Sequence, residues 1–391
     1  MVIDSPQSPP QSVQSMEFKG HPRVMISGAT LGLGGIRTHL TLLCQLLRKR
    51  GVEVSLFANG SDWDQESLAR VKAIGVRLLL PPAAFRQTRK LASLYSSLSW
   101  PVLVPHKANS LYCIGAGRSH LLLNKLRPKQ TLSINHEIVE PPGADSLAGQ
   151  CAANLDSTVA NSKKVAQIMH NFWPQKPIRV IPFLTSDRSA PIPEPRAPVG
   201  GGMLRVVYLG RLVEQKRPDQ LVRRWREIRQ HPVMNPARLD IYGYDPAGKM
   251  KAEMEACIAA NQLSDQVTLH GEYKLSDLPR ILAESDLVVL PSLWEGLPLV
   301  LVEAMLKGVP FVATAAGGTE ELGLKNPDVI VTSTEWEDFE KGLIQMAERL
   351  RAGSINARRL HSWAEDGYGY TTVSRKWLEC LCKPRSFFNI Q

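Results

Sequence analysis

The sequence predicts an α/β protein of two domains, each built on a parallel sheet with helices on both faces. Its 391 residues exceed what one ordinary core accommodates. Apolar residues make up 43% of the chain, which is enough to fill two cores. Short apolar runs alternate with helical stretches through both halves, and a segment rich in Pro and Gly separates the halves. This pattern is typical of two doubly wound, Rossmann-like domains with a cleft between them.

The first domain is expected over residues 23–183, after a flexible tail at residues 1–22. The tail is rich in Pro, Ser and Gln, so it cannot bury enough apolar surface to offset the entropy of ordering it. Residues 23–27 form a short apolar run followed by glycines, which predicts a buried strand. The elements predicted after it are a helix that ends near Gly51, strand 52–57, helix 65–74, strand 76–80, strand 110–114, helix 117–126, strand 130–135, strand 157–160, helix 162–172 and strand 178–181.

Residues 184–203 are expected to be a linker, because they contain four prolines and three consecutive glycines. The second domain follows over residues 204–370, and residues 371–391 are expected to form a helix and tail that can pack back on the first domain. The predicted elements are strand 204–209, helix 218–230, strand 238–243, helix 247–262, strand 266–270, helix 276–284, strand 286–290, helix 299–307, strand 309–314, strand 328–332 and helices near 335–351, 355–365 and 371–382.

The basic excess of the chain lies entirely in its first half. Residues 1–184 carry 21 Lys and Arg against 10 Asp and Glu, whereas residues 185–391 carry 26 against 27. This asymmetry fits an anionic acceptor, an anionic membrane leaflet or an ordinary solvated surface. Nucleic acid is disfavoured, because aromatic residues are only 6% and no nucleic-acid motif is present.

The cysteines and the hydropathy pattern bear on the compartment. The six cysteines are scattered and show no metal-site spacing. Neither a secretory signal nor a membrane-spanning apolar run is recognisable. We therefore expect a cytoplasmic protein with free thiols, and the basic first half leaves open a peripheral position on the inner face of a membrane.

The strongest chemical signal is a pair of acids, Glu295 and Glu303, around the start of a predicted helix. They lie roughly 12 Å apart along the helix axis at about 1.5 Å per residue. That spacing suits a carboxylate at each end of a nucleotide sugar, one on the sugar and one on the ribose. The helix start offers unpaired N–H groups to an anion. An isolated acid in so apolar a helix as that of Glu303 needs a partner.

A second signal follows the first strand of the second domain. Arg211 and Lys216 lie in a loop at the end of that strand, where a ligand cleft is expected. Their charges suit a diphosphate and can neutralise a leaving group without a metal. Two such residues are also common on solvated surfaces. The Asp62-Trp63-Asp64 triplet, which has a metal-binding spacing, is interpreted as chance.

Three weaker signals lie at other predicted strand ends. Gly34 and Gly35 belong to a glycine-rich turn that fails the dinucleotide spacing, because Arg37 stands where the third glycine belongs. His136 ends a strand that should face the cleft. Gly318 and Glu321 follow strand 309–314. Each of these signals also fits a purely structural turn.

Together these residues resemble family 4 of the retaining glycosyltransferases, which have the GT-B fold. The resemblance covers residues 23–382 and is most specific over 204–322, where Gly-Arg-Leu with a lysine, Pro-Ser-x-x-Glu-Gly, the spaced glutamates and Gly-Gly-x-x-Glu occur in the family's order. Two departures are Arg37, where many members have an acid, and Gly243-Tyr244-Asp245 in place of Gly-x-Gly.

The resemblance implies a role for each motif. Arg211 and Lys216 would hold the diphosphate of a UDP- or GDP-linked donor, and Glu303 would bind its ribose. The donor sugar would contact His136 and the segment Glu295, Gly296, Leu297, Pro298 and Leu299. Gly34 and Gly35 would pass close to the phosphates, and Gly318 and Glu321 would support the donor.

The resemblance also implies the reaction. Transfer to a glycan or lipid-linked hydroxyl would retain the anomeric configuration and need no metal or other cofactor. Two alternatives stay open: a catalytically silent GT-B protein that acts as a binding partner, and a different Rossmann-like enzyme such as an epimerase or dehydrogenase. The spaced glutamates and the failed dinucleotide spacing count against them.

Overall fold

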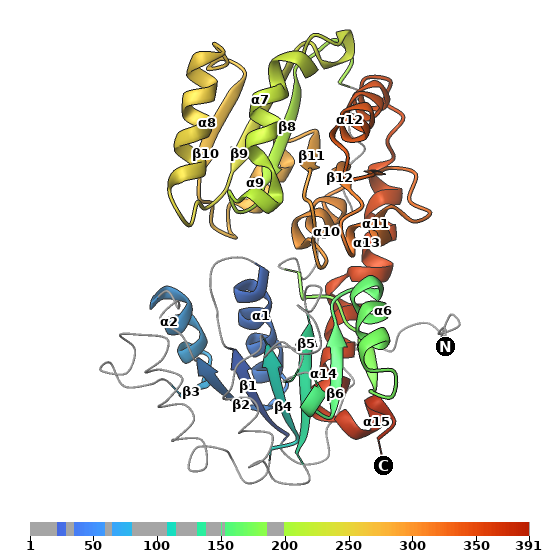
Figure 1. The fold of residues 1–391 in the computed structure, drawn as a ribbon. Helices are drawn as coiled ribbons and strands as arrows, with labels where there is room; N and C mark the ends of the chain where they lie inside the picture. Colours follow the sequence, from blue (N-terminus) through green and yellow to red (C-terminus); the bar gives the residue numbers. More distant parts are fainter. Residues whose placement is uncertain are drawn as a thin grey trace.

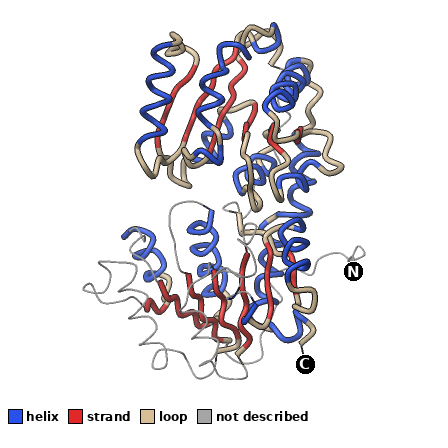
Figure 2. Tube along the Cα trace, in the orientation of Figure 1, coloured by secondary structure: helices blue, strands red, loops and turns tan. Residues whose placement is uncertain are grey.

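The computed structural model describes residues 22–28, 35–58, 65–79, 108–114, 131–137, 150, 153–185 and 199–390. It contains two α/β units stacked one above the other (Figure 1). Helices flank the strands of both units (Figure 2). The predicted fold class is confirmed, because every strand pairing in both sheets is parallel.

The N-terminal sheet has the strand order β3-β2-β1-β4-β5-β6-β7. Its strands are β1 (Arg23–Gly28), β2 (Glu53–Ala58), β3 (Arg77–Leu79), β4 (Ser110–Ile114), β5 (Leu132–Glu137), β6 (Ser157–Ala160) and β7 (Ile178–Val180). The helices described in this unit are α1 (Gly35–Lys49), α2 (Gln65–Ala73) and α6 (Lys163–Phe172). The predicted helix 117–126 lies outside the described residues.

The C-terminal sheet has the order β10-β9-β8-β11-β12-β13. Its strands are β8 (Leu204–Leu209), β9 (Ala237–Tyr242), β10 (Val267–Gly271), β11 (Leu287–Leu290), β12 (Phe311–Thr314) and β13 (Ile330–Thr332). Its helical elements are η3 (Glu214–Lys216), α7 (Pro218–Ile228), η4 (Pro232–Met234), α8 (Lys249–Ala260), α9 (Leu278–Ala283), α10 (Leu299–Leu306), α11 (Thr319–Gly323), α12 (Trp336–Arg351) and α13 (Ala357–Tyr368).

The central strands are buried on both faces, as their continuous apolar runs predict. All four residues of β11 and all four of β12 are buried. Helix α7 has one apolar face, which buries Leu221, Val222 and Trp225 in the same core. The sheet is thereby fixed in place, and the loops at its strand ends are free to carry chemistry.

The last two helices, α14 (Tyr370–Cys382) and α15 (Pro384–Phe388), return to the N-terminal unit (Figure 1). Trp377 and Leu381 are completely buried in the N-terminal core. The Trp377 indole N–H donates to the Pro182 carbonyl at 2.9 Å, and the Ser110 hydroxyl donates to the Leu381 carbonyl at 2.8 Å. Helix α14, although it follows the C-terminal unit in sequence, therefore belongs to the core of the N-terminal unit.

Two short helices differ from the sequence prediction. Helix α11 forms where a glycine turn was expected, and α15 forms where a tail was expected. Both have only five residues, too few for a helical period to be read from the sequence. Among the described helices, none combines the length and apolar character needed to span a membrane.

Candidate functional site

The candidate site lies where β8 and β11 are neighbours in the C-terminal sheet. The strand order reverses at this point: β9 and β10 follow β8 on one side, and β12 and β13 follow β11 on the other. The loops after β8 and β11 therefore diverge and leave room for a ligand. The loop after β8 carries residues 210–217, and the loop after β11 carries residues 291–298. The loop after β12, residues 315–318, adjoins the second of these.

An ion pair joins the first two loops. The Lys216 Nζ contacts the Glu295 Oε1, and only 13% and 11% of the two side chains are exposed. The Ser292 hydroxyl donates to the same carboxylate oxygen at 2.7 Å. Both contacts fall on Oε1, which leaves Oε2 to accept from a ligand hydroxyl. The sequence predicted both charged residues for the site, and the structure brings them together.

Backbone contacts hold the Glu295 segment from its other side. The Gly318 N–H donates to the Gly296 carbonyl at 2.8 Å. Gly317 has φ of 56°, and a Cβ atom there would lie 1.8 Å from the Glu295 carbonyl oxygen. Only glycine combines the left-handed backbone with this close approach. The Gly-Gly motif therefore serves to seat the loop that carries Glu295.

Helix α10 begins directly after this loop. Pro298 occupies its N-cap position and provides no side-chain cap, while its carbonyl accepts the Leu301 N–H at 3.1 Å. Among the described residues, this leaves the Leu299 and Val300 N–H groups at the helix start for an anion. Glu303 lies inside the helix and is 8% exposed. Tyr273 is its electrostatic neighbour: burial raises the pKa of the Tyr273 hydroxyl, and the Glu303 charge raises it further.

Arg211 is exposed at the rim of the site. Its carbonyl accepts a hydrogen bond from the buried Tyr208 hydroxyl at 2.9 Å, which fixes the backbone of the loop. Burial raises the pKa of Tyr208, and the charge of Glu295 adds to the effect. Tyr208 thus remains a neutral donor, and the Arg211 side chain is accessible from solvent.

Several predicted site residues lie where the two units meet. A Cβ atom on Gly35 would come 3.3 Å from Leu299 Cδ1, so the start of α1 faces the start of α10. A Cβ atom on Gly318 would come 2.6 Å from the Ser162 Cβ. The Glu321 Oε1 accepts the Lys164 backbone N–H at 2.7 Å, at the beginning of α6. The observed contact of the Glu321 carboxylate is thus with the N-terminal unit, and its role toward a donor stays a prediction.

Two predicted residues are only partly accounted for. The backbone of His136 pairs with Ile114 and Val159 near the C-terminal end of β5, as the sequence predicted for a cleft-facing strand end. Its side chain lies outside the described part of the structure, as does Gly34. Their contacts with a donor stay predictions.

Sequence reasoning missed four residues of this region. The Ser292 hydroxyl donates to the Glu295 carboxylate, and Arg217 donates to the Pro291 carbonyl at the start of the same loop. Tyr208 is an electrostatic neighbour of Glu295, and Tyr273 is one of Glu303. Ser292 lies within the Pro-Ser motif and could have been found as a hydroxyl three residues before a glutamate. The side chain of Arg217 follows Lys216 directly and gave no signal of its own.

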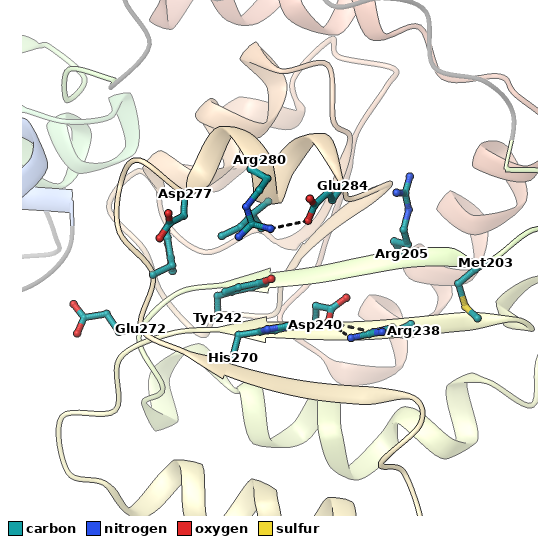
Figure 3. A pocket seen from close by; sticks show the side chains of 12 residues that line it. Met203, Arg205, Arg238, Asp240, Tyr242, His270, Glu272, Asp277, Arg280 and Glu284 are labelled. Carbon is teal, nitrogen blue, oxygen red and sulfur yellow. Dashed lines mark hydrogen bonds and ion pairs between the residues drawn. The ribbon is translucent and has the colours of Figure 1, made fainter.

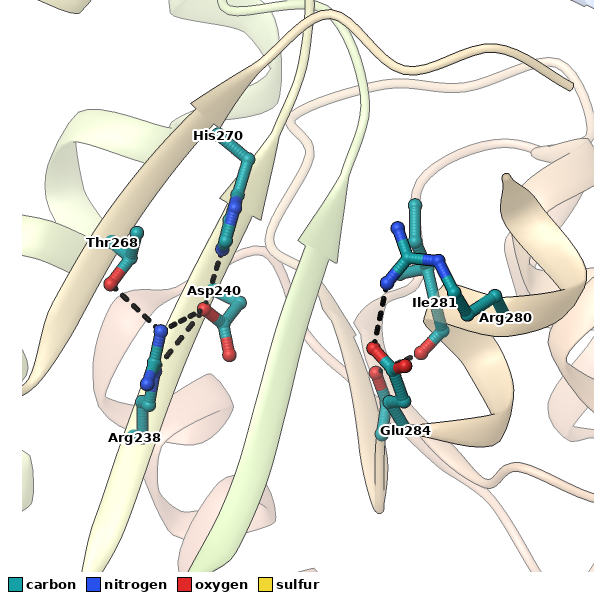
Figure 4. A network of polar contacts seen from close by, with 8 residues as sticks. Arg238, Asp240, Thr268, His270, Arg280, Ile281 and Glu284 are labelled. Carbon is teal, nitrogen blue, oxygen red and sulfur yellow. Dashed lines mark hydrogen bonds and ion pairs between the residues drawn. The ribbon is translucent and has the colours of Figure 1, made fainter. Parts of the chain in front are cut away.

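A separate groove of about 650 Å³ runs along one face of the C-terminal sheet, between β9, β10 and α9 (Figure 3). Tyr242 stacks on His270 with ring centroids 4.1 Å apart. His270 Nε2 lies 2.7 Å from Asp240 Oδ1, which also accepts from Arg238 (Figure 4). The groove follows the strands rather than their ends, and its lining residues are not those of the predicted site.

Comparisons with known proteins agree with this arrangement. The family profile described as Glycosyltransferase Family 4 matches residues 33–183, and the one described as Glycosyl transferases group 1 matches residues 204–349. A search of curated proteins finds no match.

Many solved structures share the fold. HepE of Anabaena with UDP and glucose is 18% identical, with a TM-score of 0.74 over 93% of this chain and all of that one. Sucrose-phosphate synthase of Thermosynechococcus elongatus is 17% identical, with a TM-score of 0.73 over 95% of this chain and all of that one. The lipopolysaccharide outer core galactosyltransferase WaaB is 16% identical, with a TM-score of 0.63 over 91% and 99%.

The two profiles together cover most of the chain, each on one of the two parallel-sheet units. The Lys216–Glu295 pair and Glu303 fall within the group 1 match. The chain therefore belongs to glycosyltransferase family 4 and has the GT-B fold.

Proposed function

We propose that this glycosyltransferase moves a hexose from a UDP-sugar to a hydroxyl acceptor with retention of the anomeric configuration and without a metal ion. The observation that carries the proposal is the largely buried Lys216–Glu295 pair in front of the start of α10, which has no side-chain cap. It places one cation and one carboxylate beside the Leu299 and Val300 N–H groups at the start of the helix. UDP is preferred to GDP because HepE structures contain UDP and UDP-glucose.

The described side chains suggest how the donor is held. Lys216 and the exposed Arg211 would face the diphosphate, whose charge grows as the sugar departs. The start of α10 adds its partial positive charge to the same region. Glu295 Oε2 would accept from sugar hydroxyls, and Glu303 from the ribose. Because Lys216 and Arg211 would stabilise the charge of the leaving group, the proposal requires no metal.

Retention follows from the side on which the acceptor arrives. Lys216 and Ser292 hold one oxygen of the Glu295 carboxylate, and the proposal uses the other to accept from sugar hydroxyls, so it gives Glu295 no role as a nucleophile. We propose instead that the acceptor approaches the face of the sugar from which the diphosphate departs, and that the diphosphate takes the acceptor proton. The bond from the anomeric carbon to the diphosphate oxygen breaks as the bond to the acceptor oxygen forms on the same face.

The N-terminal unit is proposed to hold the acceptor, a glycan or a lipid-linked intermediate. Its excess of basic residues would attract an anionic acceptor or an anionic leaflet from the cytoplasmic side. Flotation with anionic and neutral liposomes at low and high salt checks the membrane version. Binding to anionic vesicles that disappears at high salt is expected, whereas no binding at low salt would remove the membrane from the proposal.

A turnover assay tests the reaction itself. Release of nucleotide from a panel of UDP- and GDP-sugars is measured in EDTA, with a mixture of lipid and oligosaccharide acceptors. We expect one UDP-sugar to react, and the anomeric coupling constant of the product, read by NMR, to match that of the donor. An inverted product contradicts retention, and turnover that requires added Mg²⁺ contradicts the metal-free mechanism.

A further inference from the structure

Arg217 has an unusual backbone for its residue type. It stands between η3 and α7 in the left-handed conformation, with φ of 50° and ψ of 39°. A residue with a Cβ atom is sterically disfavoured in this region, and a following proline disfavours helical angles further. Glycine would occupy the position without that cost. We therefore looked for a contact of the arginine side chain that glycine could not make.

The side chain is also buried, with 7% of the residue exposed. Burial lowers the pKa of the Arg217 guanidinium, which shows that the surroundings disfavour its charge. The Arg217 Nε donates to the Pro291 carbonyl at 2.5 Å. Pro291 is the first residue after β11, so the bond crosses from one donor loop to the other.

The two residues before Arg217 bind the same loop further along. The Gln215 carbonyl accepts from the Leu293 N–H at 2.8 Å, and the Gln215 amide donates to the Trp294 carbonyl at 2.5 Å. Lys216 then contacts the Glu295 carboxylate. Three consecutive residues, 215–217, thus hold the segment 291–295 from its first residue to its last. We name residues 215–217 the loop clamp.

We propose that Arg217 is a positioning residue, which anchors the start of the 291–295 segment so that Glu295 meets Lys216 in the geometry that binds the donor. The donor part of this inference rests on the proposed function, whereas the anchoring part stands on the contacts alone. Arg217 acts through Glu295 and Lys216, and it need not touch the donor.

Arg217→Gly removes the anchor and relieves the backbone strain. Gln262→Gly is the matched control, because Gln262 also has positive φ, of 54°, is exposed and lies outside both loops. Hydrogen exchange is followed by mass spectrometry over residues 287–300 of the free protein. Arg217→Gly should exchange the Leu293 amide at least about tenfold faster, since a hydrogen bond to a charged donor contributes about 1.5–3 kcal/mol. Gln262→Gly should leave that exchange unchanged.

Nucleotide binding supplies the second readout. The affinity of Arg217→Gly for UDP should fall about tenfold while its melting temperature stays close to that of Gln262→Gly. Guanidinium at millimolar concentration should restore part of the affinity in Arg217→Gly and none in the control. Arg217→Lys keeps the charge and the stem, so it should bind UDP with intermediate affinity.

The two readouts fail separately. Unchanged exchange over residues 287–300 in Arg217→Gly overturns the anchoring role, whatever the nucleotide result. Faster exchange with unchanged UDP affinity overturns the link from anchoring to donor binding. If the wild-type protein binds no nucleotide, the proposed function fails, and the exchange data still decide whether Arg217 positions the loop.

Discussion

The Lys216 ammonium and the Glu295 carboxylate lie in a site that solvent barely reaches, with 13% and 11% of the side chains exposed. Each charge is tolerated there because the other neutralises it. Ser292 adds a hydrogen bond to the same carboxylate. The pair therefore fixes the two loops relative to each other. In the proposed function, a donor diphosphate would share Lys216 without reorganising it.

Removing both members of this pair should cost less stability than the sum of the two single removals. Lys216→Met leaves a largely buried carboxylate without its cation, and the loss of about 3–5 kcal/mol known for fully buried pairs is its upper bound. The double variant Lys216→Met with Glu295→Gln carries no such charge, so its loss should be smaller than the sum of the single losses. Urea unfolding of the four proteins measures this coupling. Additive losses would mean that the two groups do not stabilise each other.

At the scale of elements, the glycine turn after β12 determines where the Glu295 loop can lie. Gly317 contributes the left-handed turn and the close approach to the Glu295 carbonyl, and Gly318 contributes a hydrogen bond to Gly296. The turn after β12 and the loop clamp after β8 hold the same loop from opposite sides. The position of the site thus depends on three neighbouring strands rather than on one motif.

Gly317→Ala tests this dependence against Gly248→Ala. Both glycines have positive φ, 56° and 69°, but a Cβ atom at Gly248 would meet nothing within 4 Å. Each variant should pay the left-handed cost of about 1–2 kcal/mol. Gly317→Ala should lose more, because its new methyl group overlaps the Glu295 carbonyl, and it should also lose UDP affinity. Thermal unfolding and UDP titration compare the two variants. Equal effects would show that the close approach is unimportant.

At the scale of the whole molecule, the two units meet through a few specific contacts. Glu321 of α11 accepts the Lys164 N–H at the beginning of α6, and Gly318 faces Ser162. Helix α14 returns to the N-terminal core through Trp377. The loops of the C-terminal unit and the N-terminal unit are therefore connected beside the candidate site.

The Glu321 contact should make this link sensitive to pH. Burial raises the pKa of the Glu321 carboxyl, and the Lys164 N–H opposes part of that rise. The folded protein holds this proton more tightly than the unfolded chain does. The stabilising contribution is therefore fully present below the unfolded pKa and is lost as the pH rises through the folded pKa.

Glu321→Gln removes the titration and keeps an oxygen for Lys164. The melting temperature of the wild type minus that of Glu321→Gln should increase as the pH falls from about 8 to about 4, the range in which a raised carboxyl pKa acts. Glu337→Gln, exposed on α12 and not among the charges that shift the Glu321 pKa, is the control. A difference that stays constant or shrinks on acidification would contradict the account of Glu321.

Much of this architecture could be predicted from the sequence, because buried parallel strands are continuous apolar runs with loops at their ends. That rule located β8 and β11, and it placed Arg211, Lys216, Glu295 and Glu303 at one edge of the sheet. Long-range partners could not be predicted in the same way. The contact of Glu321 with Lys164 joins residues 157 positions apart, and only the folded chain reveals it.

Arg217 was beyond prediction for a different reason. Its role depends on a backbone angle and on burial, and neither leaves a pattern in neighbouring residue types. Motif spacing identifies residues that share a ligand, whereas a residue that positions another is identified by its contacts.

The central claim is that the C-terminal unit binds a uridine diphosphate through Lys216, the start of α10 and Glu303. Calorimetric titration of UDP in EDTA, on the wild type, Glu303→Gln and the exposed control Glu337→Gln, tests it most directly. We predict metal-free binding to the wild type and the control, and a loss of about tenfold or more in Glu303→Gln, since a buried carboxylate acceptor contributes about 1.5–3 kcal/mol. Absence of binding to a folded wild type, or equal affinity in all three proteins, would contradict the account.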